Sequence, residues 1–462
     1  MTIGRFGRIV GWLLLVGLLC AVDGRGTRAE TPTPGPGPGF AAAPAPARPS
    51  PAQPSTDVLR VEHDGVALPY TVWTKMPPAL VTTPDGGAWA IFSAFARRSD
   101  GLDGRRLYAA RFDPAARVWL PARPLPGGTD QFGPAAVVDR LGTVHLVYSD
   151  RTAATAESFA TLVYARTTGD GGWDAPVPVA PHPEAGHQML PALAVDGEDR
   201  LHVLWRDQRA VGPELRALDP GNADLFASDL QDGAWSPPVQ VNRRPNPTSN
   251  ASYPNLAVDG DRLVAIWSAY KGTTAKEMEK ATRVEWSTRP LNDPTGWSRP
   301  QSLLDRADGE VGGPLLDLAA DPRGGVGLVY GRLSPNVAPP AVSNTLYLRR
   351  LEPGMEEWGG DLPLGSGDFG FSPALAIGPD GAVYVAYDDG RNRAIEVGAV
   401  TVPPGATAAA PAVVLTTAED GEHGQAAIAI AADGRPWVAY MRAADGAAPT
   451  EIRCLRGPRL TT

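Results

Sequence analysis

The sequence predicts an all-β fold, a seven-bladed β-propeller of four-stranded antiparallel blades, from two repeat series that run in phase along its 462 residues. The first series is an aspartate that precedes a short apolar alternating run, with a mean spacing of 58 residues: Asp85, Asp139, Asp196, Asp259, Asp321, Asp380 and Asp433. The second is a tryptophan that keeps the same register: Trp119, Trp173, Trp235, Trp297 and Trp358. The repeated unit shows no helical periodicity, so both series indicate a repeated β-sheet.

The third copy shows the unit most clearly. Its four expected strands are Pro191–Asp196, Leu201–Trp205, Asp224–Ser228 and Pro238–Val241, with tight turns at 197–200 and 232–235. In other copies the first strand also begins at a proline, at Pro134, Pro254, Pro314 and Pro373. The runs are rich in Val, Leu, Ala and Trp, as expected for sheets that pack against a neighbour on both faces. A β-solenoid is the alternative, but its coils are usually much shorter than this unit.

The two ends of the repeat region indicate how the ring closes. The last unit stops after a third strand, Glu451–Leu455, and therefore lacks its fourth. A strand-like segment that belongs to no unit, Tyr70–Thr74, precedes the first one. We expect this segment to complete the last blade, so that N- and C-terminal strands pair and leave no open edge.

The N-terminal residues indicate export. In residues 1–29, Arg5 and Arg8 precede an apolar stretch at Ile9–Val22, and small residues follow at Thr27–Ala29, as in a cleaved signal peptide. Lipidation at Cys20 and an uncleaved anchor are the alternatives. Residues 30–56 form a Pro/Ala/Gly-rich linker, expected to be disordered, and residues 57–462 form the propeller. The expected location is therefore the cell envelope or the exterior, with a membrane involved only through an N-terminal anchor.

Charge and cysteine content limit the partners and cofactors. The formal net charge is −9, and it becomes −12 once residues 1–29, with four Arg and one Asp, are removed. This balance argues against nucleic acid and anionic membrane surfaces as partners. Cys20 and Cys454 are the only cysteines, so neither a disulfide framework nor a cysteine metal site is expected. We predict no cofactor and no metal.

Candidate ligand residues lie in the loops of one face. In a propeller, the loops between strands two and three open on the same face as the loops between blades, and ligands usually bind there. We call this the loop face. The second-to-third loops contribute Arg151, Arg209, Arg391 and Arg393. The blade-to-blade loops contribute Glu184, His187, Asn250, Tyr253, Asp308, Glu310, Asp368, Phe369, Glu422 and His423. This mixture of arginines, carboxylates and aromatics suits a polar, anionic or sugar-like ligand.

A recurring motif has an aromatic residue, an aspartate two residues later and then an arginine. The aspartate–arginine pairs are Asp150 and Arg151, Asp207 and Arg209, and Asp389 and Arg391. The arginines could converge on one carboxylate or sulfate. The interpretation that we favour is structural, because a single asymmetric pocket needs different residues from different blades. Each aspartate then caps its own loop and each arginine pairs locally.

The remaining polar and aromatic candidates are expected to be structural. His187 and His423 have no partner at metal-ligand spacing, and we interpret them as solvated loop residues. The regular spacing of the five tryptophans marks them as core anchors rather than sugar-stacking platforms. The sequence contains neither a nucleophile elbow nor a phosphate-binding loop.

Two turns carry a family resemblance. Asp170-Gly-Gly-Trp173 and Asp232-Gly-Ala-Trp235 resemble degenerate Asp boxes, so residues 70–457 resemble the sialidase-like, BNR/Asp-box class of propellers. The resemblance implies the architecture. No copy matches a full Asp box, the Arg-Ile-Pro signature is absent, and seven units differ from six blades. The arginine triad, Tyr–Glu pair and Asp acid/base of sialidases cannot be assigned to residues here.

The predicted function is that of an exported ligand-binding or interaction module, with a glycan or a protein as partner. The alternative is a sialidase-like glycoside hydrolase, which needs carboxylates, or a tyrosine backed by a glutamate, facing one another over the channel. A purely structural surface component is the third class.

Overall fold

The computed structural model describes residues from Thr56 to Gly457 in segments. The residues outside the description are 1–55, 64–65, 69, 73–75, 97–104, 129, 152–158, 182–185, 213, 215–221, 243–248, 272–280, 306–309, 334–343, 368–372, 390–395, 412, 416–421, 444–450 and 458–462. Every described residue belongs to one compact unit, Pro54–Thr462. The expected signal peptide and nearly all of the expected linker therefore lie outside the described residues. Within the described segments, no helix is long and apolar enough to cross a membrane.

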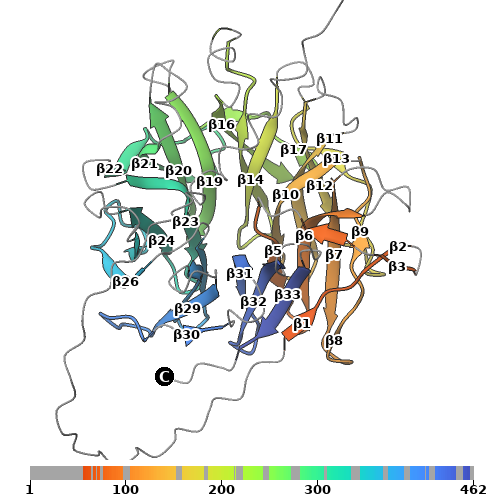
Figure 1. Cartoon of the computed structure of the whole chain (residues 1–462). Coiled ribbons are helices and arrows are strands. Elements are labelled where there is room, and N and C mark those ends of the chain that lie inside the picture. Colours follow the sequence, from red (N-terminus) through yellow and green to blue (C-terminus); the bar gives the residue numbers. More distant parts are fainter. Residues whose placement is uncertain are drawn as a thin grey trace, which may run out of the picture. The chain divides into compact units, whose positions relative to one another are not determined.

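Seven antiparallel sheets follow one another around a ring and form a seven-bladed β-propeller (Figure 1). Blade 1 contains β4 (Tyr70–Val72), β5 (Ala79–Thr82), β6 (Ala88–Ala96), β7 (Arg105–Asp113), β8 (Val118–Trp119) and β9 (Arg123–Pro124). Blade 2 contains β10 (Asp130–Val138), β11 (Val144–Arg151), β12 (Thr161–Arg166) and β13 (Val177–Pro178). Blade 3 contains β14 (Gln188–Val195), β15 (Leu201–Asp207), β16 (Asp224–Gln231), β17 (Ala234–Trp235) and β18 (Val239–Gln240).

The other four blades repeat this order. Blade 4 contains β19 (Ser249–Asp259), β20 (Arg262–Lys271), β21 (Ala281–Pro290) and β22 (Gln301–Asp305). Blade 5 contains β23 (Glu310–Ala320), β24 (Val326–Leu333), β25 (Asn344–Leu351) and β26 (Leu362–Gly367). Blade 6 contains β27 (Ala374–Ile377), β28 (Val383–Asp389), β29 (Glu396–Val402) and β30 (Val413–Val414). Blade 7 contains β31 (Glu422–Ile430), β32 (Pro436–Ala443), β33 (Glu451–Arg456) and β1 (Thr56–Val58), while β2 (Val61–His63) and β3 (Val66–Leu68) form a separate hairpin.

Ring closure uses an N-terminal strand, as predicted, but a different one. β1 pairs with β33, with Asp57 opposite Cys454, and the red and dark-blue strands lie side by side in Figure 1. The prediction that Tyr70–Thr74 completes the last blade is wrong. Its described part, β4, instead pairs with the end of β6, while β5 pairs with the beginning of β6. β4 and β5 therefore lie one after the other along the same edge of β6. The prolines between them interrupt the strand, so the sequence pattern indicated a first strand that begins only at β5.

Six of the seven aspartates in the series cap the turn between the first and second strand of their blade. In blade 2, Asp139 Oδ1 accepts hydrogen bonds from the amides of Leu141 (2.9 Å) and Thr143 (2.8 Å). Asp196 Oδ1 makes the equivalent bonds in blade 3, and the carboxylates of Asp85, Asp321, Asp380 and Asp433 also accept from an amide two residues later. Asp259 differs, because its Oδ1 accepts from Gly325 of the next blade at 2.8 Å. The repeat is thus a hydrogen-bonding device.

The hydrophobic core consists of seven clusters of described residues, and each joins two neighbouring blades. One example combines Leu204 and Leu225 of blade 3 with Ala265 and Trp267 of blade 4. Another combines Phe92 of blade 1 with Trp437 of blade 7 across the closure. The five recurring tryptophans belong to or pack against these clusters, which confirms their interpretation as core anchors. Burial of both faces explains why the strands are apolar throughout.

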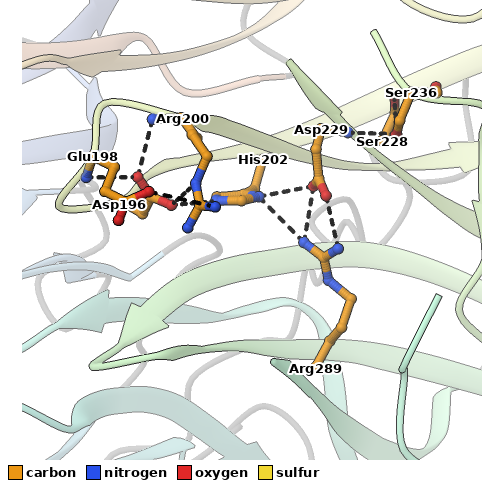
Figure 2. A network of polar contacts seen from close by, with 8 residues as sticks. All are labelled: Asp196, Glu198, Arg200, His202, Ser228, Asp229, Ser236 and Arg289. Carbon is orange, nitrogen blue, oxygen red and sulfur yellow. Dashed lines mark hydrogen bonds and ion pairs between the residues drawn. The ribbon is translucent and has the colours of Figure 1, made fainter. Parts of the chain in front are cut away.

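A buried polar network also joins blades 3 and 4 (Figure 2). Arg289 of β21 donates to both oxygens of Asp229 of β16, from Nη1 at 2.7 Å and from Nη2 at 2.9 Å. His202 lies between two carboxylates, with Nδ1 2.8 Å from Asp229 Oδ1 and Nε2 3.2 Å from Asp196 Oδ2. Arg200 Nε donates to the same Asp196 oxygen at 2.7 Å. The network links a turn cap of one blade to the third strand of the next.

Candidate functional site

The first strands of the blades form the wall of the central channel. Each first strand contacts that of the next blade, and β31 contacts β5, so the contacts run around the whole ring. Five of these strands contain a register shift: at Phe132/Ala135, Met189/Ala192, Ser252/Asn255, Val311/Leu316 and Gly424/Ala427. Such β-bulges bend a strand and redirect its side chains. The predicted strands that began at a proline therefore continue upstream, past the bulge.

The bulges place unusual backbone conformations around the channel. Leu190, Tyr253 and Gln425 have positive φ angles of 54°, 51° and 52°, and Gly133 has one of 63°. Positive φ angles of this size are those of the left-handed helical conformation, which costs a residue with a Cβ atom about 1–2 kcal/mol. The contacts of the surrounding strands must therefore stabilise this conformation at Leu190, Tyr253 and Gln425. Proline follows in three of the four cases, at Pro134, Pro191 and Pro254, and it narrows the conformations of the residue before it.

A cavity of about 290 Å³ lies inside this ring of bulges, and all seven blades contribute to its wall. Most of the wall is apolar and comes from the prolines, Met76, Leu190, Leu316 and the alanines of blades 6 and 7. The polar side chains are Tyr253, Asn255 and Asp317. They come from the adjacent blades 4 and 5, so the cavity has one polar edge and an apolar remainder.

Asp317 is the carboxyl group of this edge. Its Oδ1 accepts a hydrogen bond from the amide of Leu318 at 2.9 Å, and its Oδ2 accepts one from Leu375 of blade 6 at 2.8 Å. Burial raises the pKa of Asp317 to about 7, although the two amide hydrogen bonds act in the opposite direction. A carboxyl group that titrates near neutrality in a cavity is the kind of group that marks functional sites.

Tyr253 and Asn255 complete the polar edge. The Asn255 side-chain amide donates to the Tyr253 carbonyl at 3.3 Å, across the proline between them. Burial raises the pKa of Tyr253, with Arg206 acting against it, so the phenol stays protonated and can donate a hydrogen bond. Tyr253 was among the predicted ligand residues and lies in the cavity wall.

The arginines with described side chains pair locally, as predicted. Arg151 Nε donates to Asp130 at 2.6 Å, and Arg105 of blade 1 donates to the same carboxylate at 2.7 Å. Arg209 Nε donates to Asp207 at 2.9 Å, and its guanidinium also lies 5.0 Å from the centre of the Phe226 ring. Local pairing is thus confirmed for Arg151 and Arg209, while Arg391 lies outside the described residues.

The predicted loop caps follow the same pattern. Asp150 Oδ2 accepts from the Gly128 amide at 2.8 Å, in the loop that leads into its own blade. Asp207 Oδ1 accepts from the Arg209 amide at 2.7 Å, and its Oδ2 accepts from the indole of Trp205 at the same distance. The side chain of Asp389 lies outside the description.

His187 is half-buried, so its interpretation as a solvated loop residue is wrong. Its Nδ1 accepts a hydrogen bond from the Ala160 amide at 3.0 Å, and Phe159 packs edge-on at 5.2 Å between ring centres. Burial lowers the pKa of His187 to about 4, and nearby Arg151 and Arg206 act in the same direction. The imidazole is therefore neutral at physiological pH. Among the described residues, no cluster of His, Cys, Asp or Glu could hold a metal ion.

The other predicted ligand residues cannot be placed in the cavity. Glu184, Arg393, Asp308, Asp368 and Phe369 lie outside the described residues. Glu310 and His423 lie on β23 and β31, as Asn250 does on β19 and Glu422 on β31, but their side chains are outside the description. Sequence reasoning missed Asn255 and Asp317. The available signal was a carboxylate inside the apolar run Leu316-Asp317-Leu318, at a position expected to be part of a strand.

No family model matches the sequence, and a search of curated proteins finds no match. The fold has solved counterparts. An ulvan lyase of polysaccharide lyase family PL25 has a TM-score of 0.57 at 10% identity, over 83% of this chain and 96% of that one. The polysaccharide lyase Uly1 has a TM-score of 0.53 at 11% identity, over 89% and 98%. A protein of unknown function from Dyadobacter fermentans DSM 18053 has a TM-score of 0.51 at 11% identity, over 87% and 98%. At these identities the similarity establishes the propeller fold.

Proposed function

We propose that this chain is an exported glycan-binding β-propeller, held at the cell envelope or secreted, that receives one sugar unit of a glycan in its central cavity. The observation that carries the proposal is the division of the cavity wall. Tyr253, Asn255 and Asp317 form a polar edge, and prolines and alanines form the rest. A sugar ring presents hydroxyl groups at its rim and C–H groups on its faces, so it matches both parts of such a wall. The volume of about 290 Å³ is at the small end for ligand sites and suits one sugar unit.

The structural counterparts support a glycan over a protein as the ligand. One solved structure is described as the PL25 ulvan lyase bound to -[GlcA(1-4)Rha3S]-, and it has a TM-score of 0.55 over 86% of this chain. That ligand belongs to the lyase. It supports the proposal only as an example of a glycan held on a propeller of this architecture.

Glycan-array screening followed by isothermal titration calorimetry tests the proposal. We expect saturable binding of at least one glycan by the chain from residue 54 onward. Tyr253→Phe removes one hydroxyl and should weaken that binding about threefold to tenfold. Leu141→Ala is the matched control, since Leu141 is 88% exposed and does not line the cavity. Equal losses for both variants, or no binding of any glycan, would contradict the proposal.

A sialidase-like glycoside hydrolase is the second candidate, and one observation favours it. A carboxyl group whose pKa is raised to about 7, as in Asp317, can act as a general acid near neutral pH. The mechanism also requires a second carboxylate or a tyrosine nucleophile opposite it. Turnover of fluorogenic sialosides or other glycosides that is lost in Asp317→Asn would favour the hydrolase. Binding without turnover would favour the module.

Export is part of the proposal and rests on residues 1–29. Expression of the full chain in a bacterial host, followed by N-terminal sequencing of the mature protein, tests it. A mature N-terminus near residue 30 in the envelope or medium is expected. A cytoplasmic protein that retains Met1 would contradict export. A lipid on Cys20 would show that the protein is anchored to the membrane as a lipoprotein instead of being released by cleavage near residue 30.

A further inference from the structure

The carboxyl group of Asp317 has hydrogen-bonding capacity that the protein leaves for a ligand. Each carboxylate oxygen can accept about two hydrogen bonds, and each of these oxygens receives one from a backbone amide. Asp317 is half-buried and lines the cavity, so its exposed surface belongs to the cavity wall. A group in the cavity can therefore reach the remaining acceptor sites.

The charge of Asp317 also has no counter-ion among the described residues. Its pKa is governed by burial and by the amides of Leu375 and Leu318, with no contribution from a charged side chain. The arginines with described side chains on strands packed against β23 are engaged with other carboxylates: Arg262 with Asp259, Arg283 with Glu285, Arg289 with Asp229 and Arg332 with Asp361. The titratable neighbour in the cavity wall is Tyr253, which is neutral. An ionised Asp317 would be a partly buried charge that receives two amide hydrogen bonds but has no counter-ion, which is costly.

We propose that the cavity selects a sugar that carries an ammonium group, with Asp317 as its counter-ion. This inference rests on the proposed glycan-binding function and specifies the ligand class. An ammonium group supplies the missing charge and can donate to the acceptor sites that the amides leave open. Tyr253 and Asn255 then remain for hydroxyl groups of the same sugar. A sugar carboxylate or sulfate at this position would face a like charge and is disfavoured.

The test compares oligosaccharides of glucosamine with the N-acetylated oligosaccharides of the same length. They differ in whether the nitrogen carries a charge, and both can occupy a general sugar site. By calorimetry at pH 7 we expect the ammonium form to bind about 10- to 100-fold more tightly, the range of a hydrogen bond to a charged group.

Proton release provides a second readout that needs no variant. At pH 6 the free Asp317 carboxyl is mostly protonated, because its pKa is about 7. A bound ammonium group lowers that pKa, so binding should release close to one proton, and affinity should fall as the pH is lowered from 7 to 5. Titrations in buffers of different ionisation enthalpy measure this release. The N-acetylated ligand should release none.

Asp317→Asn should remove both the preference for the ammonium form and the proton release. Equal affinity for the two ligands, or no proton release, would overturn the inference and leave the proposed glycan-binding function standing. Binding of neither ligand, together with no binding of any glycan on the array, would instead contradict the proposed function. If Asp317→Asn does not fold, the wild-type comparison and its proton release decide the matter.

Discussion

Replacement of Arg289 by leucine should destabilise the propeller strongly, because it breaks a buried ion pair between two blades. The side chains of Arg289 and Asp229 are 1% and 13% exposed, and their two hydrogen bonds measure 2.7 and 2.9 Å (Figure 2). Burial raises the pKa of Asp229, but the bonds from His202 and Arg289 outweigh it and hold the pKa below its ordinary value. Arg289→Leu therefore leaves a carboxylate in the interior without its main cation.

The expected loss is about 3–5 kcal/mol of unfolding free energy, the range for removing one partner of a buried pair. Urea unfolding followed by tryptophan fluorescence measures it. With an m-value of about 3 kcal/mol/M or more for a chain of this size, the midpoint should fall by about 1 M. The double variant Arg289→Leu with Asp229→Leu should recover part of the loss, because both charges are gone.

The matched control is Arg140→Leu, which also breaks an arginine–aspartate pair between neighbouring blades. Arg140 Nη2 lies 3.0 Å from Asp199, but the two side chains are 67% and 26% exposed. This pair should contribute less than about 1 kcal/mol. The reasoning fails if Arg289→Leu costs no more than Arg140→Leu, or if the losses in the double variant simply add.

Three further predictions concern single positions. Asp139→Ala should lower the unfolding free energy by about 1–3 kcal/mol in urea unfolding, because two turn amides lose their acceptor, and Asp139→Asn should lower it less. An alanine variant as stable as the wild type would refute the capping role. Arg117→Gly should raise the unfolding free energy by up to about 1 kcal/mol, because exposed Arg117 has a φ of 57°, where glycine is not strained. Arg117→Ala should give no such gain. Equal effects of the two variants would show that this backbone conformation is not strained. Burial raises the pKa of Asp317 to about 7, so this group makes the unfolding free energy fall as pH rises from about 4 to 7, while the lowered pKa of His187 acts in the opposite direction. The unfolding free energy of Asp317→Asn should therefore fall less, or rise more, over this range than that of the wild type, and identical pH dependence in the two proteins would contradict the assigned environment.

Much of the architecture could be predicted from local sequence. A turn cap and a core tryptophan act within one blade or across one junction, so they recur whenever a blade recurs. The repeat register that Asp139 and Asp196 mark and the local pairing of Arg151 and Arg209 followed from that repetition, whereas the hydrogen bonds by which these aspartates cap their turns came from the structure. The recurrence of the aspartate–arginine pairs in several blades is also the reason why we interpreted these arginines as structural.

The closing strand could not be chosen from the sequence. Thr56–Val58 and Tyr70–Val72 are both short and both can pair with an edge. The choice depends on which strand edges are left unpaired in the folded ring. β6 is nine residues long, and β5 pairs with only part of it, so the rest of its edge is free. The free part of β6 takes β4, so the edge of β33 takes β1.

By itself the sequence determined the repeat, its register, the number of blades and the five tryptophans that anchor the core, because these depend on contacts close in the chain or with an adjacent blade. Only the tertiary structure decided which side chains face the central cavity. Tyr253, Asn255 and Asp317 come together because bulges in two first strands turn them toward the same edge. A bulge shifts the side-chain alternation that a sequence pattern relies on. The pKa of Asp317 likewise arises from burial against Leu375, 58 residues further along the chain.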